Sequence, residues 1–290
     1  MEGHHHHEHH HGDESALADL LDLDAEVLGP FLDELTAWVG EQADRTPRTV
    51  ADLGAGTGTG TLALARRFPA ADIVAVDRSP LMLDRLRAAA RGQGLGERVR
   101  LLQTDLDAAL PPLGAPDLVW AAASLHHVED PARLLREVHA ALPPGGLLAV
   151  VEMDGMPRLL SDEAGAALEA RCREALAGSG PDPYPDWGPV LAAAGFEVAA
   201  RRDFPVEVRP APPGAVRYAR AVLSGYRSRL AGHLAAADLA ALDRLLSADS
   251  PESLRHRELV VRGTRTAWAA RRPAPGGARV LPAGPIRWDA

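Results

Sequence analysis

The sequence has no lysine, no asparagine and a single cysteine, Cys172. One cysteine excludes an intrachain disulfide, a cysteine-based zinc site and an iron–sulfur cluster. The missing lysine excludes a Schiff-base mechanism, and the missing asparagine excludes any site that needs an asparagine ligand. The exclusive use of arginine resembles the codon bias of a GC-rich genome.

Long apolar runs and a surplus of positive charge are also absent. Acidic residues outnumber Lys and Arg by 40 to 31, whereas nucleic-acid binders usually show a basic footprint. The apolar stretches at 118–123 and 147–151 are far shorter than the roughly 20 residues that a bilayer requires, and no signal segment opens the chain. We therefore expect a cytoplasmic protein without a nucleic-acid or membrane partner.

The 290 residues, 46% of them hydrophobic, suit one large α/β domain or two small ones. We assign residues 15–272 to one domain, which opens with two helices at 15–46 that are separated near Pro30. The His-rich segment 1–14 has too few apolar residues to fold, whether it is a tag or a natural metal-binding tract. The Pro/Gly-rich tail 273–290 also lies outside the domain.

Strands and helices alternate in the first half of the domain. Strands are predicted at 49–53, 72–76, 99–103, 117–122 and 147–151, with helices after the first, second and fourth. Ser79-Pro80 and Asp130-Pro131 mark the starts of the last two helices. This alternation predicts a doubly wound α/β fold with a parallel sheet.

The regular alternation of strands and helices stops after Glu152. Helices are predicted at 161–177, 187–194, 213–231 and 235–247, and strands at 196–200 and 258–270; whether the first of these strands continues to about 208 is left open. Residues 155–187 and 205–258 are predicted to form a helical cap, because 205–258 is too long for an ordinary connection.

Three strand ends in this order carry residues suited to an adenosine. Glycines alternate at 54–60 after the first strand, Asp77 ends the second, and Asp105 follows the third. Ligands of such sheets bind at these carboxyl ends. Asp77 could accept both ribose hydroxyls, and Asp105 could accept a hydrogen bond from the adenine amine.

The sequence lacks the motifs of two other kinds of nucleotide-binding site. A dinucleotide fingerprint requires a third glycine where Thr59 or Thr61 stands. A phosphate P-loop requires a lysine, which the chain lacks.

Five motifs together resemble the class I S-adenosylmethionine-dependent methyltransferases. They are DLGAGTG at 52–58, Asp77, Thr104-Asp105, SLHHVEDP at 124–131 and LPPGGLL at 142–148. The resemblance covers about 45–155 and is greatest to enzymes that methylate quinone rings and sugars. It implies a seven-stranded, mostly parallel sheet whose last strand, predicted at 258–270, is antiparallel.

The resemblance also implies a cofactor site for S-adenosylmethionine. Asp52 would hold the methionine amino group through water or backbone, and Ala121 would contact the methionine part through its backbone. Asp77 would hold the ribose and Asp105 with Leu106 the adenine, while Arg78 and Met82 would flank the adenine. The remaining residues expected at the cofactor are Gly54, Ala55, Gly56, Thr57, Gly58 and Thr104.

Methyl transfer needs alignment of the acceptor and, for a hydroxyl, a general base. His126 and His127 follow the fourth strand, where related enzymes place a histidine base, and Glu152 could orient that histidine or bind the acceptor. Alternatively, one histidine packs under the sheet edge and the other caps the next helix. No metal is expected, because a catechol-type magnesium site uses an asparagine.

The acceptor pocket is predicted from scarce aromatic residues. They are Trp38, Tyr184, Trp187, Tyr218 and Tyr226. Alternatively, Trp38 is core, and the tyrosines pack beneath a solvated face of arginines.

The sequence thus predicts O-methylation of a small molecule, with a secondary metabolite as the expected acceptor, without a metal. The alternatives are C- or N-methylation, a cofactor-assisted cyclisation or rearrangement, and a non-catalytic cofactor-binding partner. A homodimer stays open.

Overall fold

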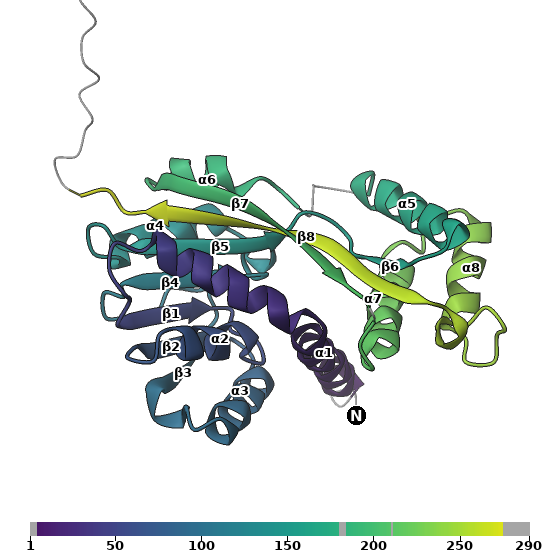
Figure 1. Cartoon of the computed structure of the whole chain (residues 1–290), viewed down its shortest axis with the longest axis horizontal. Helices are drawn as coiled ribbons and strands as arrows, with labels where there is room; N and C mark the ends of the chain where they lie inside the picture. Colours follow the sequence, from purple (N-terminus) through teal and green to yellow (C-terminus); the bar gives the residue numbers. More distant parts are fainter. Residues whose placement is uncertain (1–4, 180–183, 210, 275–290) are drawn as a thin grey trace, which may run out of the picture.

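One mixed sheet forms the centre of the computed structural model, which describes residues 5–179, 184–209 and 211–274 (Figure 1). The sheet has eight strands in the described chain. Seven of them lie in the order β3-β2-β1-β4-β5-β8-β6, and the eighth, β7, pairs with β8. Their bounds are β1 Thr49–Leu53, β2 Asp72–Asp77, β3 Val99–Gln103, β4 Leu118–Ala122, β5 Leu147–Met153, β6 Arg158–Leu160, β7 Glu197–Val208 and β8 Leu259–Arg271. The first five are parallel and β8 is antiparallel to β5, which confirms the predicted fold class. The additional strand β6 was not predicted.

The helices that connect the parallel strands begin where the sequence predicts. They are α2 (Thr59–Arg67), α3 (Pro80–Gly92) and α4 (Pro131–Ala141). The Ser79 hydroxyl accepts a hydrogen bond from the Met82 amide at 3.1 Å, and each of α3 and α4 has a proline in its first turn. These caps satisfy amide groups that a helix start leaves without partners.

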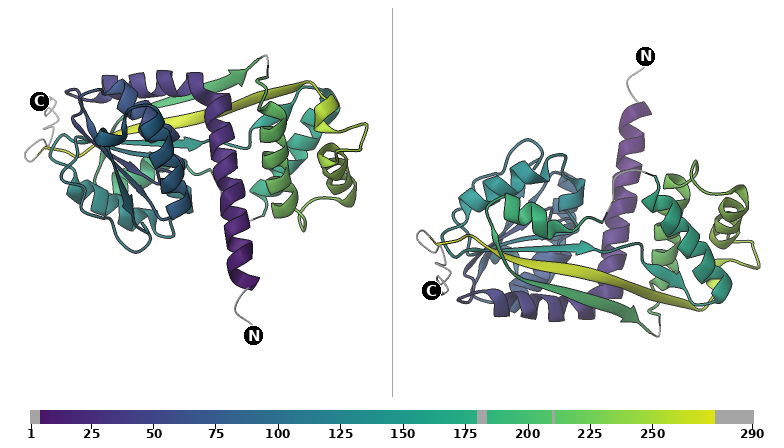
Figure 2. Two further views of the ribbon diagram at one scale, coloured as in Figure 1. Left: turned by 90° about the horizontal axis from the view of Figure 1, so that it is seen from below. Right: turned by 90° about the horizontal axis from the view of Figure 1, so that it is seen from above.

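The N-terminal segment differs from its prediction. One continuous helix, α1 (His5–Gln42), replaces two helices and includes residues 5–14, which were expected to lie outside the fold. Figure 2 shows that its two halves point in different directions. Gly29-Pro30 lies between them. Proline removes one helical hydrogen bond but fits helical φ, so a helix can bend there without ending.

The two halves of α1 pack on different parts of the molecule. Leu35, Trp38 and Val39 of the second half are buried against one face of the sheet. Leu23 and Val27 of the first half join a separate apolar cluster with the cap. The first half therefore crosses between the sheet and the cap, as Figure 2 shows.

The cap is formed by helices at the far ends of β7 and β8. It contains α5 (Glu163–Ala177), α7 (Ala215–Arg229) and α8 (Ala236–Leu246), while α6 (Trp187–Ala193) lies beside the sheet (Figure 1). Three short 3-10 helices complete the described chain: η1 (Gly96–Arg98), η2 (Leu125–His127) and η3 (Leu254–His256). The predicted helices are therefore present, and the strand predicted at 196–200 continues to Val208 as β7.

No helix among the described residues is long and apolar enough to cross a bilayer. Residues 1–4 of the His-rich segment and 275–290 of the predicted tail lie outside the described residues.

Candidate active site

A cavity of about 600 Å³ opens along the carboxyl ends of the parallel strands. Its wall includes residues from or just after β3, β2, β1, β4, β5 and β8, and the first part of α1 covers it. This is the edge of the sheet at which ligands of open α/β folds bind, and the volume lies within the range of small-molecule sites.

The glycine turn after β1 is fixed by close backbone contacts. The amides of Gly54 and Ala55 both donate to the Val76 carbonyl at 2.9 Å. Gly54 has φ +72°, and a Cβ there would lie 2.5 Å from the Ser124 Cβ. Only glycine fits a left-handed backbone so close to the neighbouring loop, so the turn keeps its backbone exposed to the cavity.

Asp77 joins this turn to the start of α3. Its carboxylate accepts hydrogen bonds from the Gly56 amide at 2.8 Å and the Ser79 amide at 2.9 Å. The side chain lines the cavity at the tip of β2, where a ribose is expected.

Asp52 is a buried carboxylate at the centre of the site. It accepts a 2.5 Å hydrogen bond from the Thr61 hydroxyl. Burial raises the pKa of Asp52 to about 7, and the nearby Asp77 adds to the rise. A cationic group placed beside Asp52 would stabilise its charged form.

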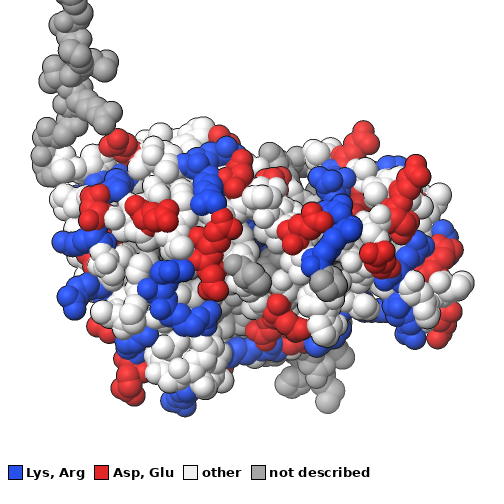
Figure 3. Space-filling model, viewed as in Figure 1, with Lys and Arg blue, Asp and Glu red and all other residues white. Residues whose placement is uncertain are grey.

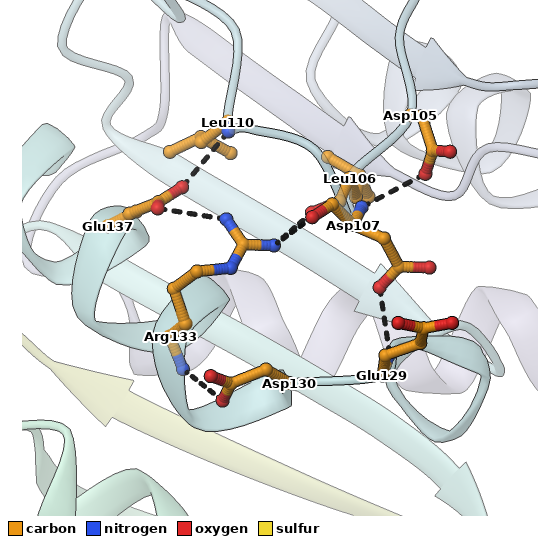
Figure 4. Close-up of polar contacts among 8 residues, drawn as sticks. All are labelled: Asp105, Leu106, Asp107, Leu110, Glu129, Asp130, Arg133 and Glu137. Carbon is orange, nitrogen blue, oxygen red and sulfur yellow. Dashed lines mark hydrogen bonds and ion pairs between the residues drawn. The ribbon is translucent and has the colours of Figure 1, made fainter.

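The loop after β3 is held in shape by polar contacts with α4 (Figure 4). Asp105 accepts from the Asp107 amide at 3.0 Å. The Arg133 guanidinium donates to the carbonyls of Leu106 and Asp107, and pairs with Glu137 at 2.8 Å. Arg133 thereby fixes the loop in which an adenine contact is predicted, a role that sequence reasoning missed.

Most of the predicted cofactor residues lie on the cavity wall, but two do not. Those on the wall are Asp52, Gly54, Ala55, Gly56, Thr57, Asp77, Arg78, Met82, Thr104, Asp105 and Leu106. Gly58 lies instead against Leu86 of α3. The Ala121 side chain is buried in the core of the other sheet face, because side chains alternate along β4 and its neighbours Trp120 and Ala122 face the cavity, so the contact predicted for its backbone stays a prediction.

The turn after β4 is held by Glu152 of β5. One carboxylate oxygen accepts from the amides of Ser124 and Leu125 at 3.1 and 3.0 Å, and the other lies 2.7 Å from His126 Nδ1. Ala123, just before this turn, has the left-handed φ of +50°. Glu152 and His126 are thus parts of the scaffold that shapes the turn.

His127 is the member of the predicted catalytic set that lies on the cavity wall. Burial lowers its pKa, and the charge of the neighbouring His126 lowers it further. His127 is therefore neutral near pH 7, with one ring nitrogen able to accept a proton.

The aromatic residues predicted at the acceptor do not line the cavity. Trp38 packs edge-on against Phe204, with ring centroids 5.6 Å apart, in the core under α1. Trp187 is buried in the core of the opposite sheet face. Their apolar surface is used in the cores, which corrects the expected substrate role.

The three tyrosines belong to the cap. The hydroxyls of Tyr184 and Tyr226 lie 3.2 Å apart. Tyr218 is buried, and its hydroxyl donates to Asp24 Oδ1 at 3.1 Å. Tyr218 thus reaches the cavity only through Asp24, which lies on its wall.

Sequence reasoning missed the part of the wall that α1 and β8 supply. These residues are Glu14, Leu17, Leu21, Asp24, Phe31, Leu32, Leu35 and Arg265. The helical spacing of the leucines was a signal of a buried face, but it did not indicate what that face covers.

The residues present fit a bound S-adenosylmethionine. The left-handed Gly54 leaves the backbone accessible, the Asp52 carboxylate suits an amino group, and Asp77 and Asp105 lie in order along neighbouring strands. A flat adenine, a diol and an ammonium group would each meet a complementary partner.

Comparison with known proteins agrees with this geometry. Residues 50–146 match the family model "Methyltransferase domain". Trans-aconitate 2-methyltransferase from Methylobacterium radiotolerans is 37% identical over 52% of this chain and 54% of its own length. Demethylmenaquinone methyltransferase from Thermus thermophilus is 36% identical over 40% of this chain and 51% of its own length. The chain spans about half the length of these curated relatives.

Solved structures share the fold. A candidate methyltransferase from Bacillus halodurans C-125 superposes with a TM-score of 0.54 at 20% identity, covering 82% of this chain and 99% of its own. The YcgJ protein from Bacillus subtilis gives a TM-score of 0.50 at 17% identity, covering 82% and 97%. With the matched domain and the strand-end residues, residues 50–146 therefore belong to the class I S-adenosylmethionine-dependent methyltransferases, whose cofactor is S-adenosylmethionine.

Proposed function

We propose that this chain transfers a methyl group from S-adenosylmethionine to an oxygen atom of a small organic molecule. The observation that carries this proposal is the extent of the cavity. The predicted cofactor residues occupy the wall at β3, β2 and β1, while the wall continues past His127 to β5, β8 and the apolar face of α1. The cavity thus extends beyond the predicted cofactor residues.

His127 is the proposed general base. S-adenosylmethionine supplies an activated methyl on a sulfonium, so the protein must align the acceptor and remove its proton. The neutral imidazole of His127 accepts the hydroxyl proton, and Glu152 positions the turn that presents it. Among the described residues, no group of three or more His, Cys, Asp or Glu side chains is arranged to hold a metal.

The acceptor is proposed to be a small molecule rather than a nucleic acid. On the face in Figure 3, Arg side chains are interspersed with Asp and Glu and form no basic patch. Trans-aconitate and demethylmenaquinone, named for the two relatives, serve as comparison acceptors, because the first presents only carboxylates and the second a quinone ring, whereas the His127 mechanism requires a hydroxyl. A role in secondary metabolism, a cytoplasmic location and a homodimer remain predictions from the sequence.

The test begins with cofactor binding. S-adenosylhomocysteine at a hundredfold excess over its dissociation constant should stabilise the fold by about 2.7 kcal/mol, whereas NADH should not. Asp77→Ala should remove the effect. The absence of any stabilisation in the wild type would overturn the proposal.

Catalysis is tested next with His127→Gln, once an acceptor is found. An O-methylation that uses His127 as base should slow by about 10²- to 10⁴-fold at unchanged affinity for S-adenosylhomocysteine. Unchanged turnover would favour a carbon acceptor or another base. Cofactor binding without turnover of any acceptor would favour the non-catalytic alternative.

A further inference from the structure

Arg265 lies at the end of the cavity farthest from the predicted adenine site. It pairs with Met153 in the β5–β8 ladder, two positions from the pair Val151–Ala267. Residues two apart along a strand face the same side, so Arg265 shares the face of Val151, which also lines the cavity. Three strand spacings separate β1 from β8, which is about 14 Å.

The guanidinium of Arg265 is enclosed and has one described partner. Its side chain is 13% exposed, the lowest fraction of any arginine in an ion pair of the described chain. Nη2 donates to Asp24 Oδ1 at 3.2 Å, and this same oxygen accepts from the Tyr218 hydroxyl at 3.1 Å. An arginine has five N–H donors in a planar fork. Most of the donors of Arg265 therefore have no bond to the described protein.

Apolar side chains share the cavity with Arg265. Leu21 and Phe31 of α1 and Val151 of β5 line it, together with the acidic residues Glu14 and Asp24 of α1. The other arginine on the described wall is Arg78, which lies at the adenine end with Asp105. Beyond the predicted cofactor residues, the wall thus offers apolar side chains and one arginine fork.

We propose that Arg265 binds a carboxylate of the methyl acceptor, so that the substrate is an organic acid with an apolar body and a single acid group at this end. This inference rests on the proposed function. A carboxylate matches the planar fork through two parallel hydrogen bonds. A tricarboxylate such as trans-aconitate would meet only this one arginine at the acceptor end, so the geometry favours a monocarboxylate.

Asp24 sets the strength of this contact. It faces Arg265 from α1, while Tyr218 faces the pair from α7. The negative charge of Asp24 partly cancels the positive charge of the Arg265 guanidinium. Asp24 therefore weakens the attraction of Arg265 for a second carboxylate. Asp24→Asn should therefore strengthen binding of the acid, whereas Arg265→Gln should weaken it. A purely structural ion pair predicts that both changes act in the same direction.

The experiment compares acids with their amides. Protein saturated with S-adenosylhomocysteine is titrated by calorimetry with 4-hydroxybenzoate, trans-cinnamate and trans-aconitate, and with the primary amides of the first two. Methyl transfer from labelled S-adenosylmethionine is measured for 4-hydroxybenzoate and its amide, which carry the hydroxyl that the proposed reaction methylates, while the other compounds report binding only. The variants are Arg265→Gln and Asp24→Asn, with Arg202→Gln as a matched control. Arg202 of β7 bonds to Glu34 of α1, and neither residue lies on the cavity wall.

We expect the wild type and Arg202→Gln to bind an aromatic acid more tightly than its amide. Arg265→Gln should lower acid affinity by about 10- to 100-fold and leave amide affinity unchanged, and Asp24→Asn should raise acid affinity. Equal binding of acid and amide in every pair, or a preference that survives Arg265→Gln, overturns the role of Arg265. Failure of S-adenosylhomocysteine to bind would instead overturn the proposed function.

Discussion

The buried Asp52 makes folding and cofactor binding depend on pH in opposite ways. Burial raises its pKa from 3.8 to about 7. Because the folded-state pKa lies above the unfolded one, the folded protein binds the proton more tightly. The stabilisation is complete below about pH 4 and is lost as the pH rises towards 7. At 1.36 kcal/mol per pH unit, the loss is about 4 kcal/mol.

The perturbation is Asp52→Asn, which keeps the side-chain shape and removes the titration. Unfolding by urea from pH 4.5 to 8.5 should show a wild-type free energy that falls relative to the variant until about pH 7 and then levels off. Glu169, whose pKa burial also raises to about 7, contributes with the same sign in both proteins. The difference between wild type and variant therefore isolates Asp52.

Cofactor binding should show the reverse trend. An ammonium beside Asp52 needs the ionised carboxylate, so affinity for S-adenosylhomocysteine should rise about tenfold per pH unit below pH 7 and level off above it. Asp52→Asn should bind weakly at every pH without this slope. Parallel unfolding profiles for wild type and variant, or a binding slope that persists in Asp52→Asn, would refute the reasoning.

Three further changes test the shape of the site. Gly54→Ala should lower the free energy of unfolding by about 1–3 kcal/mol, measured in urea, because the new methyl meets Ser124; unchanged stability would mean that the turn is not tightly packed. Glu152→Gln should lower kcat by about 10- to 100-fold at unchanged affinity for S-adenosylhomocysteine, since the turn bearing His127 loses charged hydrogen bonds; equal loss in both quantities would contradict this. Arg133→Met should weaken S-adenosylhomocysteine binding by about tenfold in calorimetry, and unchanged binding would remove the loop from the cofactor site.

The first half of the domain could be predicted because its signals are local. Each parallel strand is a short apolar run bounded by turn residues, and Ser79 and Asp130 mark helix starts that the structure confirms. The strand β6 has three residues and pairs only with β8, with a register shift, so no periodicity indicates it. Pro30 locally predicts the end of a helix, but α1 continues through it, because the packing of both halves outweighs one missing hydrogen bond.

The catalytic region was only partly predictable. The motif locates a histidine pair after β4, but adjacent side chains diverge, and which one faces the cavity depends on Glu152 holding His126. The aromatic residues illustrate the opposite error. Tryptophan is a scarce residue type in this chain, yet helix α1 places Trp38 against Phe204 in the core. Scarcity of a residue type does not distinguish a core from a binding surface.

The two ends of the cavity are therefore encoded differently. The cofactor end is built from turns within 50–146, the part that matches the methyltransferase domain. The acceptor end is built from α1 and Arg265, which lie outside that range and meet only through tertiary packing. The matched domain thus includes the residues predicted to hold the cofactor, whereas the proposed acceptor contacts lie in segments outside it. A substrate assignment for this chain has to come from Asp24, Arg265 and the apolar face of α1.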